Sequence, residues 1–218
     1  FNANTPADQT LWAKAAKDAA TLKKIGATAV WFPPATKGAA GKEDMGYAPY
    51  DLYDLGEFNQ KGSVGTRYGT KKEYLEAIDA MKAQGINVYA DIAVRQKLGA
   101  DSVEKVTAAD FNAKDIPQMI GNKKIVGALS KFTFAGRRSK YSKFKWNWNH
   151  FAGIDWQQDD FKKRVCELSG MTEEEAEKKY KLSKYDYIIG SELDLYNQEV
   201  YDELMTWAKW YELSLIHI

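Results

Sequence analysis

The stretch YLEAIDAMKAQGINVYADIAV (residues 74–94) decides the fold class, because it joins an amphipathic helix, a glycine and an apolar run. Thr70 and Glu73 stand just before it at the spacing of a capping box, in which two side chains satisfy free backbone N–H groups at the helix start. Gly85 follows the helix, where glycine is the usual C-terminal stop. Residues 86–94 are apolar nearly throughout, which is typical of a strand covered on both faces.

The same order occurs earlier in the chain. Residues 8–25 place apolar side chains at helical spacing, Gly26 ends that helix, and ATAVWFPP (27–34) reads as a strand closed by two prolines. A repeated order of helix, glycine and strand predicts β/α units and a parallel sheet, an α/β fold. Polar and aromatic segments follow each strand, at the edge where such folds build their sites.

The pattern stops after the second strand. Residues 95–185 are rich in aromatic residues, glycine and lysine, and we expect them to form an inserted subdomain, since structureless loops of this length are uncommon. MTEEEAEKKY (171–180) predicts a short acidic helix inside it. A last helix is predicted over 198–211. The tail ELSLIHI (212–218) neither continues that helix cleanly nor resembles a cap.

Composition narrows the class of protein. The 218 residues include 7 Trp, 13 Tyr and 9 Phe, an aromatic content that disordered chains lack. No apolar run is long enough to cross a membrane. A single cysteine, Cys166, fits a reducing compartment, so we expect a cytoplasmic protein without membrane contact. The chain begins at Phe1 rather than Met, which leaves export through a signal peptide open.

A basic and aromatic stretch suggests one alternative function. RRSKYSKFKWNWNH (137–150) interleaves cations with rings, a composition that can hold single-stranded nucleic acid. Such a run is more often a solvated face beside a core strand, and the formal net charge of +1 gives no bulk attraction to a polyanion. We therefore expect no nucleic-acid partner.

Several long motifs carry a family resemblance over nearly the whole chain up to about Tyr211. The chain resembles the α-amylases of glycoside hydrolase family 13, of the bacterial liquefying and intracellular type. The matching motifs are LKKIGATAVWFPPATKG, GYAPYDLYDLGEFNQKGSVGTRYGTKKEYLEAI, FTFAGRRSKYSKFKWNWNHFAGIDW, KYDYIIGSELD and the helix ending in WAKWY.

The resemblance implies a (β/α)8 TIM barrel with a domain inserted after its third strand. Residues 1–94 would then be a partial catalytic barrel, about the second and third β/α units. Residues 95–185 would be the inserted domain. Residues 186–218 would return to the barrel and begin its third helix, with a tail unlike the family over 212–218.

The resemblance also implies the chemistry. Retaining glycosidases of this kind use a nucleophile and a general acid, two carboxyl groups about 5 Å apart. In the family these lie on later strands, and the nucleophile's motif, similar to DGFRLDAVKH, would follow WAKWY, where ELSLIHI stands instead. We therefore assign no catalytic residue and expect this chain to be inactive by itself. The parent enzyme would hydrolyse internal bonds of α-1,4-glucans: starch, glycogen and maltooligosaccharides. The alternative is a non-catalytic remnant that binds α-glucan.

Substrate contacts follow from the same resemblance. Tyr47 matches an aromatic residue that stacks under the sugar at the cleavage point, and a flat ring suits the apolar face of glucose. The strand end DIAVRQK (91–97) matches a pattern similar to DVVxNH, with Gln96 in place of the sugar-binding His. Lys97 and His150 are further cleft candidates, although a structural histidine is the more common reading of His150.

Calcium is the family's cofactor, and its ligand positions are altered here. Asp186, Glu192 and Asp194 match acidic positions of the calcium sites. Arg95 stands where the family has a ligand Asn. Ala152 stands where relatives with several ions have Asp. Because calcium prefers six to eight oxygen ligands, these changes argue against it in this chain. We expect Arg95 to replace the metal by bridging Asp186 and Glu192; the alternative is that Arg95 extends into water.

Overall fold

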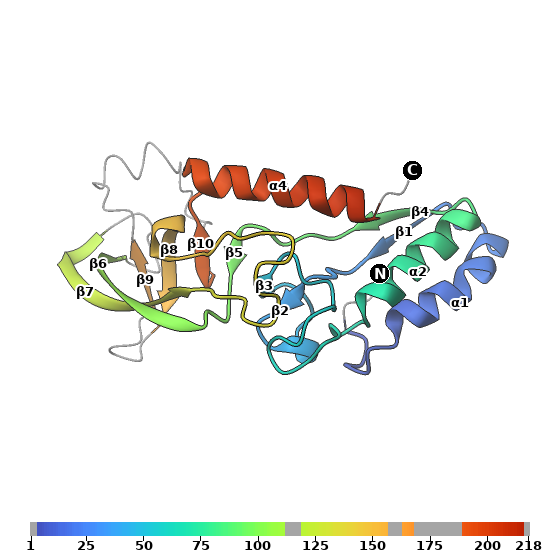
Figure 1. Cartoon of the computed structure of the whole chain (residues 1–218), viewed down its shortest axis with the longest axis horizontal. Helices are drawn as coiled ribbons and strands as arrows, with labels where there is room; N and C mark the ends of the chain where they lie inside the picture. Colours follow the sequence, from blue (N-terminus) through green and yellow to red (C-terminus); the bar gives the residue numbers. More distant parts are fainter. Residues whose placement is uncertain (1–3, 112–118, 157–162, 168–188, 216–218) are drawn as a thin grey trace. The chain divides into compact units, whose positions relative to one another are not determined.

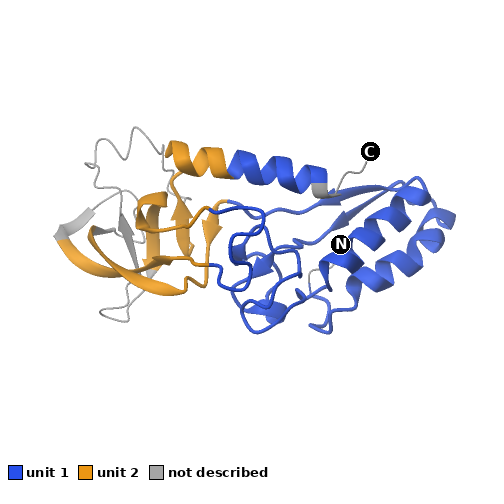
Figure 2. Ribbon diagram, in the orientation of Figure 1, with its two compact units in different colours: residues 1–94, 134–143, 204–218 blue, residues 95–133, 144–203 orange. Residues whose placement is uncertain are grey.

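A computed structural model describes residues 4–111, 119–156, 163–167 and 189–215. The described chain separates into two compact units (Figures 1 and 2). Unit 1 contains residues 1–94, 134–143 and 204–218, and unit 2 contains residues 95–133 and 144–203. Each unit is described by itself below.

Unit 1 is built on the two predicted helix–strand repeats. Its elements in chain order are α1 (Leu11–Lys24), β1 (Ala29–Phe32), α2 (Lys71–Ala83) and β4 (Asn87–Ala90). Strands β1 and β4 pair in parallel, and α1 packs against α2 (Figure 1). The capping box at the start of α2 is confirmed. The backbone N–H of Thr70 donates to the Glu73 carboxylate at 2.8 Å, and the Thr70 hydroxyl accepts from the Glu73 N–H at 3.4 Å.

Aromatic side chains fill the core of unit 1. Trp12 of α1 is fully buried, and its ring centroid lies 5.2 Å from Phe32, 5.4 Å from Tyr68 and 4.7 Å from Tyr74. Helix α4 (Gln198–Leu215) contributes Trp207 to the same core, where its indole N–H donates to the Leu52 carbonyl at 2.9 Å. The core therefore joins the helix–strand repeats to residues from the end of the chain.

The prediction that the second strand is buried on both faces was wrong. Strand β4 ends at Ala90, and Tyr89 is 63% exposed while its register partner Trp31 on β1 is 57% exposed. Ile92, beyond the strand, is 49% exposed. Side chains alternate along a strand, so Phe32 packs into the core while its neighbour Trp31 points the other way. An apolar composition alone does not say how many faces are covered.

The remaining elements of unit 1 are short. Strands β2 (Lys37–Gly38) and β3 (Pro49–Asp51) pair antiparallel, with the 3-10 helix η1 (Gly41–Glu43) between them in the chain. Residues 134–143 return to this unit from the middle of unit 2. This return was not anticipated from the sequence.

Unit 2 contains a six-stranded sheet in which the pairings are antiparallel, in the order β5-β10-β8-β9-β6-β7. The elements of this unit are β5 (Gln96–Lys97), β6 (Ser102–Phe111), β7 (Met119–Lys131), η2 (Trp148–His150), β8 (Phe151–Trp156), β9 (Lys163–Glu167) and β10 (Ser191–Leu193). The unit begins at Arg95, where the predicted insertion begins. The predicted helix over 171–180 lies outside the described residues, and the identification of unit 2 as the family's inserted domain stays a prediction.

Helix α4 corrects the expectation for the tail. It begins at Gln198, as predicted, but continues through Leu215 rather than ending at Tyr211. Glu212, Leu213 and Leu215 have good helix propensity, and no glycine or proline interrupts them. The first residues of the tail therefore belong to the helix.

Candidate functional site

The candidate substrate residue Tyr47 lies against the carboxyl end of β4. Its hydroxyl donates to Oδ2 of Asp91, the residue directly after the strand, at 2.5 Å. The Asp91 N–H in turn donates to the Phe32 carbonyl at 2.9 Å, which ties the carboxyl ends of β4 and β1 together. The Tyr47 side chain is 40% exposed, so part of its ring is open to solvent while its hydroxyl is held.

The surroundings keep the Tyr47 hydroxyl protonated. Partial burial raises the pKa of Tyr47, and the hydrogen bond and negative charge of Asp91 raise it further. A phenol with a raised pKa remains a hydrogen-bond donor across the neutral range and does not act as a base. The Tyr47 hydroxyl therefore supplies no base, and the partly exposed ring remains as a contact surface.

The predicted Arg95 contact with a calcium-ligand position is present in unit 2. Nε of Arg95 lies 2.8 Å from Oε1 of Glu192, in the strand β10. The Arg95 side chain is 50% exposed and the Glu192 side chain 15% exposed. The second half of the predicted bridge, to Asp186, lies outside the described residues.

The described side chains at the family's calcium positions include a cation, Arg95, and an alanine, Ala152. A guanidinium already occupies one oxygen of Glu192, and a bound cation there would be repelled by it. Asp194 is buried and uses its Oδ1 to accept from the Tyr196 N–H at 3.0 Å, while Ala152 provides no side-chain oxygen. Among the described residues, no group of three acidic, His or Cys side chains is arranged to hold a metal ion.

Gln96 and Lys97 form the short strand β5, which pairs with β10. Gln96 is half-buried, whereas Lys97 is only 1% exposed. The Lys97 ammonium lies 5.1 Å from the ring centre of Trp146 and 5.5 Å from that of Phe132. This burial does not favour Lys97 as a substrate contact, and it shows an internal role that the sequence did not indicate.

His150 is buried and has a partner at each ring nitrogen. Its Nδ1 accepts from the Asn147 N–H at 3.0 Å, and its Nε2 lies 3.1 Å from the Glu199 carboxylate. Its ring packs against Phe144 and Trp146. An Nδ1 that accepts requires the proton on Nε2, so the neutral ring can donate to Glu199. These contacts match the structural reading of His150 that the sequence favoured.

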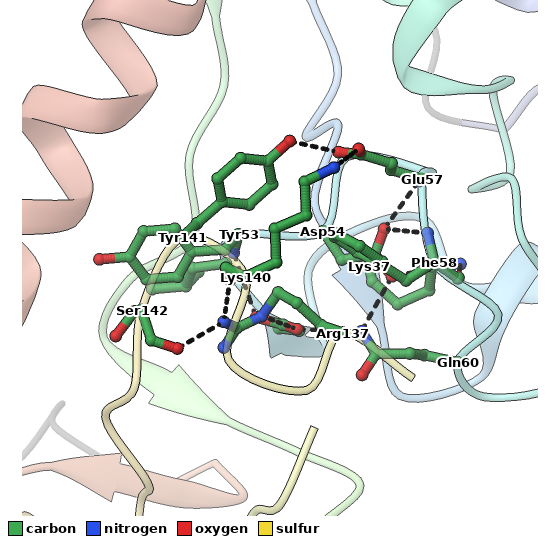
Figure 3. A network of polar contacts seen from close by, with 12 residues as sticks. Lys37, Tyr53, Asp54, Glu57, Phe58, Gln60, Arg137, Lys140, Tyr141 and Ser142 are labelled. Carbon is green, nitrogen blue, oxygen red and sulfur yellow. Dashed lines mark hydrogen bonds and ion pairs between the residues drawn. The ribbon is translucent and has the colours of Figure 1, made fainter. Parts of the chain in front are cut away.

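A buried polar network in unit 1 was missed by the sequence analysis (Figure 3). Lys37 and Asp54 are both fully buried and lie 3.6 Å apart, and Arg137 donates to Asp51 at 2.7 Å. Gln60 links the two pairs, because its amide donates to both carboxylates, at 2.9 Å to Asp51 and 3.0 Å to Asp54. Two aspartates three residues apart in an apolar context, DLYD (51–54), were the available signal.

The same network uses part of the basic stretch 137–150. Arg137 is buried against Asp51, Lys140 pairs with Glu57, and Trp146 is 4% exposed. Cations and rings that serve internal contacts are less available for a polyanion. The packing therefore does not favour the nucleic-acid alternative.

Comparison with known proteins shows the class of protein to which this chain is related. The alpha-amylase of Geobacillus stearothermophilus is 46% identical over 207 residues, which cover 94% of this chain and 38% of that protein. The cytoplasmic alpha-amylase of Escherichia coli (strain K12) is 38% identical over 209 residues, 92% of this chain and 41% of that protein. The chain thus spans about two fifths of the length of these relatives.

The resemblance to α-amylases is confirmed over nearly the whole chain, which is an amylase-like glycoside hydrolase region. Because these relatives are α-amylases, the helix–strand repeats of unit 1 are identified as part of an α/β barrel. Which units of the barrel they form remains a prediction. No protein-family model matches the chain. Truncated alternansucrase from Leuconostoc mesenteroides matches with a TM-score of 0.45 and 25% identity, covering 60% of this chain and 12% of that chain.

Proposed function

We propose that this chain is a substrate-contacting part of an α-amylase-type enzyme that acts on α-1,4-glucans, with Tyr47 as the sugar contact. The observation that carries the proposal is the 2.5 Å hydrogen bond from Tyr47 to Asp91 at the carboxyl end of β4. This bond fixes a ring that stays 40% exposed, and α/β barrels bind their substrates at that end of their strands. The apolar face of a glucose ring can stack on such an aromatic surface.

The proposal assigns binding, and no bond cleavage, to this chain. Gln96 can hydrogen-bond a sugar hydroxyl, but it cannot carry the positive charge that a histidine supplies. We assign none of these residues as nucleophile or general acid, so hydrolysis by the whole protein would depend on carboxylates outside the motifs found here. A non-catalytic α-glucan-binding protein is the second candidate, favoured by Arg95 and Ala152 at altered family positions.

Titration of the chain with maltoheptaose, followed by calorimetry, tests the binding proposal. We expect Tyr47→Ala to weaken binding about tenfold, since a stacking contact contributes on the order of 1.4 kcal/mol. Tyr47→Phe should retain most of the affinity because the ring remains. Tyr201→Ala, which removes another exposed tyrosine (53% exposed), is the matched control. Unchanged affinity of the Tyr47→Ala protein would contradict the proposal.

A reducing-sugar assay on the same samples tests the assignment of chemistry. We expect no release of reducing ends by this chain. Release that persists after repurification would show that the catalytic groups are present and that our assignment is wrong.

We further infer that the Arg95 guanidinium takes over the charge role of a cation beside Glu192. Support comes from the 2.8 Å ion pair and from the absence of a side-chain ligand at Ala152. Elemental analysis of purified protein should find no stoichiometric calcium, and the urea midpoint should be the same in calcium and in EDTA. Stoichiometric calcium bound to the unchanged chain would refute this inference.

We also propose a cytoplasmic location. The single cysteine and the cytoplasmic relative from E. coli support it. In the described part of the chain, no helix combines the length and apolarity needed to cross a bilayer. Fractionation of the source cells, with detection of the protein by an antibody, tests the location, and recovery from the medium or periplasm would contradict it.

A further inference from the structure

Residues 134–143, here called the strap, belong to unit 1, although the chain on both sides of them belongs to unit 2 (Figure 2). The side chains that hold the strap come from the polar network in Figure 3. The contacts divide into an inner lock, centred on Arg137, and an outer lock, centred on Glu57.

Arg137 makes the inner lock with three donated hydrogen bonds. Its Nε donates to Oδ2 of Asp51 at 2.7 Å, and one terminal nitrogen donates to the carbonyls of Lys140 at 2.6 Å and Ser142 at 2.9 Å. The guanidinium also lies 5.1 Å from the ring centre of Tyr53 and 4.9 Å from that of Phe134. One buried cation thus joins β3 to the strap's own backbone.

Glu57 makes the outer lock, nearer to solvent. One of its carboxylate oxygens pairs with Lys140, and the other accepts from the Tyr141 hydroxyl at 2.7 Å and from Lys71 at 3.1 Å. Tyr141 also packs against Trp210, with ring centres 4.9 Å apart and the rings tilted by 43°. The negative charge of the Glu57 carboxylate therefore binds side chains of the strap and of the first residue of α2.

The strap's backbone is strained. Phe134, Arg138 and Tyr141 have φ angles of +52°, +58° and +73°, in the left-handed region that side chains with a Cβ disfavour. At Gly136 an added Cβ would lie 2.3 Å from the Asn59 carbonyl oxygen, so only glycine fits the close approach. Such a conformation persists only while surrounding contacts enforce it, which makes its stability depend on the two locks.

We propose that the strap is a latch that opens locally, without unfolding of the unit 1 core, and that Arg137 is the positioning residue that keeps it closed. Several observations favour local opening. Six of the ten strap residues are exposed, Tyr141 and Ser142 are half-buried, and Phe134 and Arg137 are buried. The backbone bonds from Arg138 to Phe134 and from Lys140 to Arg137 stay within the strap. Opening would release the backbone strain and remove Phe134, Arg137 and Tyr141 from their contacts with the rest of unit 1.

Hydrogen exchange followed by mass spectrometry, on the full chain, tests the latch. In Arg137→Met we expect the amides of 134–143 to exchange at least about tenfold faster than in the unchanged chain and to remain faster than those of α2, which accelerate only by the loss of unfolding free energy. Arg137→Lys keeps the charge but loses the planar fork, so it should not restore the original rate. Glu57→Gln should accelerate the strap by a smaller factor, with any change in α2 confined to its first turn, which begins at Lys71. Glu76→Gln, which disturbs an exposed ion pair with Lys72 on α2, is the matched control.

Trypsin provides a second measurement, because Arg138, Lys140 and Lys143 are cleavage sites in the strap. Cleavage at these sites should accelerate in step with exchange in both lock variants. Strap amides that exchange no faster than those of α2 in the unchanged chain, or no acceleration of the strap in either lock variant, would overturn the proposal. If Arg137→Met does not fold, Glu57→Gln becomes the deciding variant. The proposal still requires its strap to exchange faster than in the unchanged chain, and unchanged strap exchange would refute the latch.

Discussion

Each unit contains an arginine–carboxylate pair, and the two pairs have nearly the same length but different surroundings. Arg137 and Asp51 in unit 1 lie 2.7 Å apart, and both side chains are 1% exposed. Arg95 and Glu192 in unit 2 lie 2.8 Å apart, with the arginine 50% exposed. By distance alone, the two ion pairs would be expected to contribute equally to stability. Burial separates them, because water reaches the Arg95 partner of the second pair but neither partner of the first.

The difference shows which contacts the fold depends on. Breaking a buried pair leaves an uncompensated charge away from water, whereas an exposed pair loses little when one partner is removed. Asp51 also accepts from the Gln60 amide, so the buried pair is one part of a network with Lys37 and Asp54.

Arg137→Met should have the largest effect. It leaves Asp51 buried with its principal cation gone, so we expect a loss of about 3–5 kcal/mol in the free energy of unfolding. Urea unfolding followed by tryptophan fluorescence measures it. Arg138→Met, which removes the exposed neighbouring arginine, should change the same quantity by less than about 0.5 kcal/mol. Similar losses in the two variants would remove the contrast between buried and exposed cations.

Lys37→Met should have the next largest effect. The Lys37 ammonium donates to the carbonyls of Ser63 at 2.7 Å and Val64 at 2.6 Å, in addition to pairing with Asp54. Burial lowers the pKa of Lys37 and raises the pKa of Asp54, so burial disfavours the charged form of both side chains. We expect a loss of about 2–3 kcal/mol, because Asp54 keeps other donors, including Gln60.

In the double variant Lys37→Met/Arg137→Met, the loss should differ from the sum of the single losses, since Gln60 connects the two pairs. Simple addition of the two single losses would show that the pairs act independently and that the network in Figure 3 has no joint role.

Acid should open the outer lock selectively. Partial burial by itself would raise the pKa of Glu57, but hydrogen bonds from Lys140, Tyr141 and Lys71 outweigh it and lower that pKa. Its stabilising contribution is therefore complete above the ordinary value of 4.5 and is lost as the pH falls through the lowered folded value. The protection factors of the strap amides, which correct for the slower intrinsic exchange in acid, should fall below about pH 4.5 in the unchanged chain, and this step should be absent from Glu57→Gln. A step of equal size in both proteins would contradict the assignment.

Arg95→Gln should have the smallest effect on stability. Because the arginine is half exposed, we expect a change of about 1 kcal/mol or less, which shrinks further as salt is added. Urea unfolding at low and high ionic strength measures it. A loss comparable with that of Arg137→Met would mean that contacts beyond Glu192 make this pair essential.

Local features of the fold could be predicted from the sequence because their causes lie within a few residues. The capping box of Thr70 and Glu73, the helix stop at Gly85 and the paired strands β1 and β4 follow from spacing and propensity. The place of Tyr47 in the site depended on the family resemblance, and its hydrogen bond to Asp91 joins residues 44 positions apart. Periodicity alone contains no information about such a contact.

The sequence by itself determined the helix–strand order and the relationship to α-amylases, because local propensities and long ordered motifs are both written along the chain. Only the tertiary structure decided which charges are buried. Arg137 and Asp51 are 86 positions apart, and Arg95 and Glu192 are 97 apart. In the sequence, the family resemblance singled out Arg95 and Glu192, but nothing distinguished Arg137 and Asp51 from ordinary charged residues. Whether water reaches such a pair depends on segments that meet only when the chain folds, and that access sets what the pair contributes to stability.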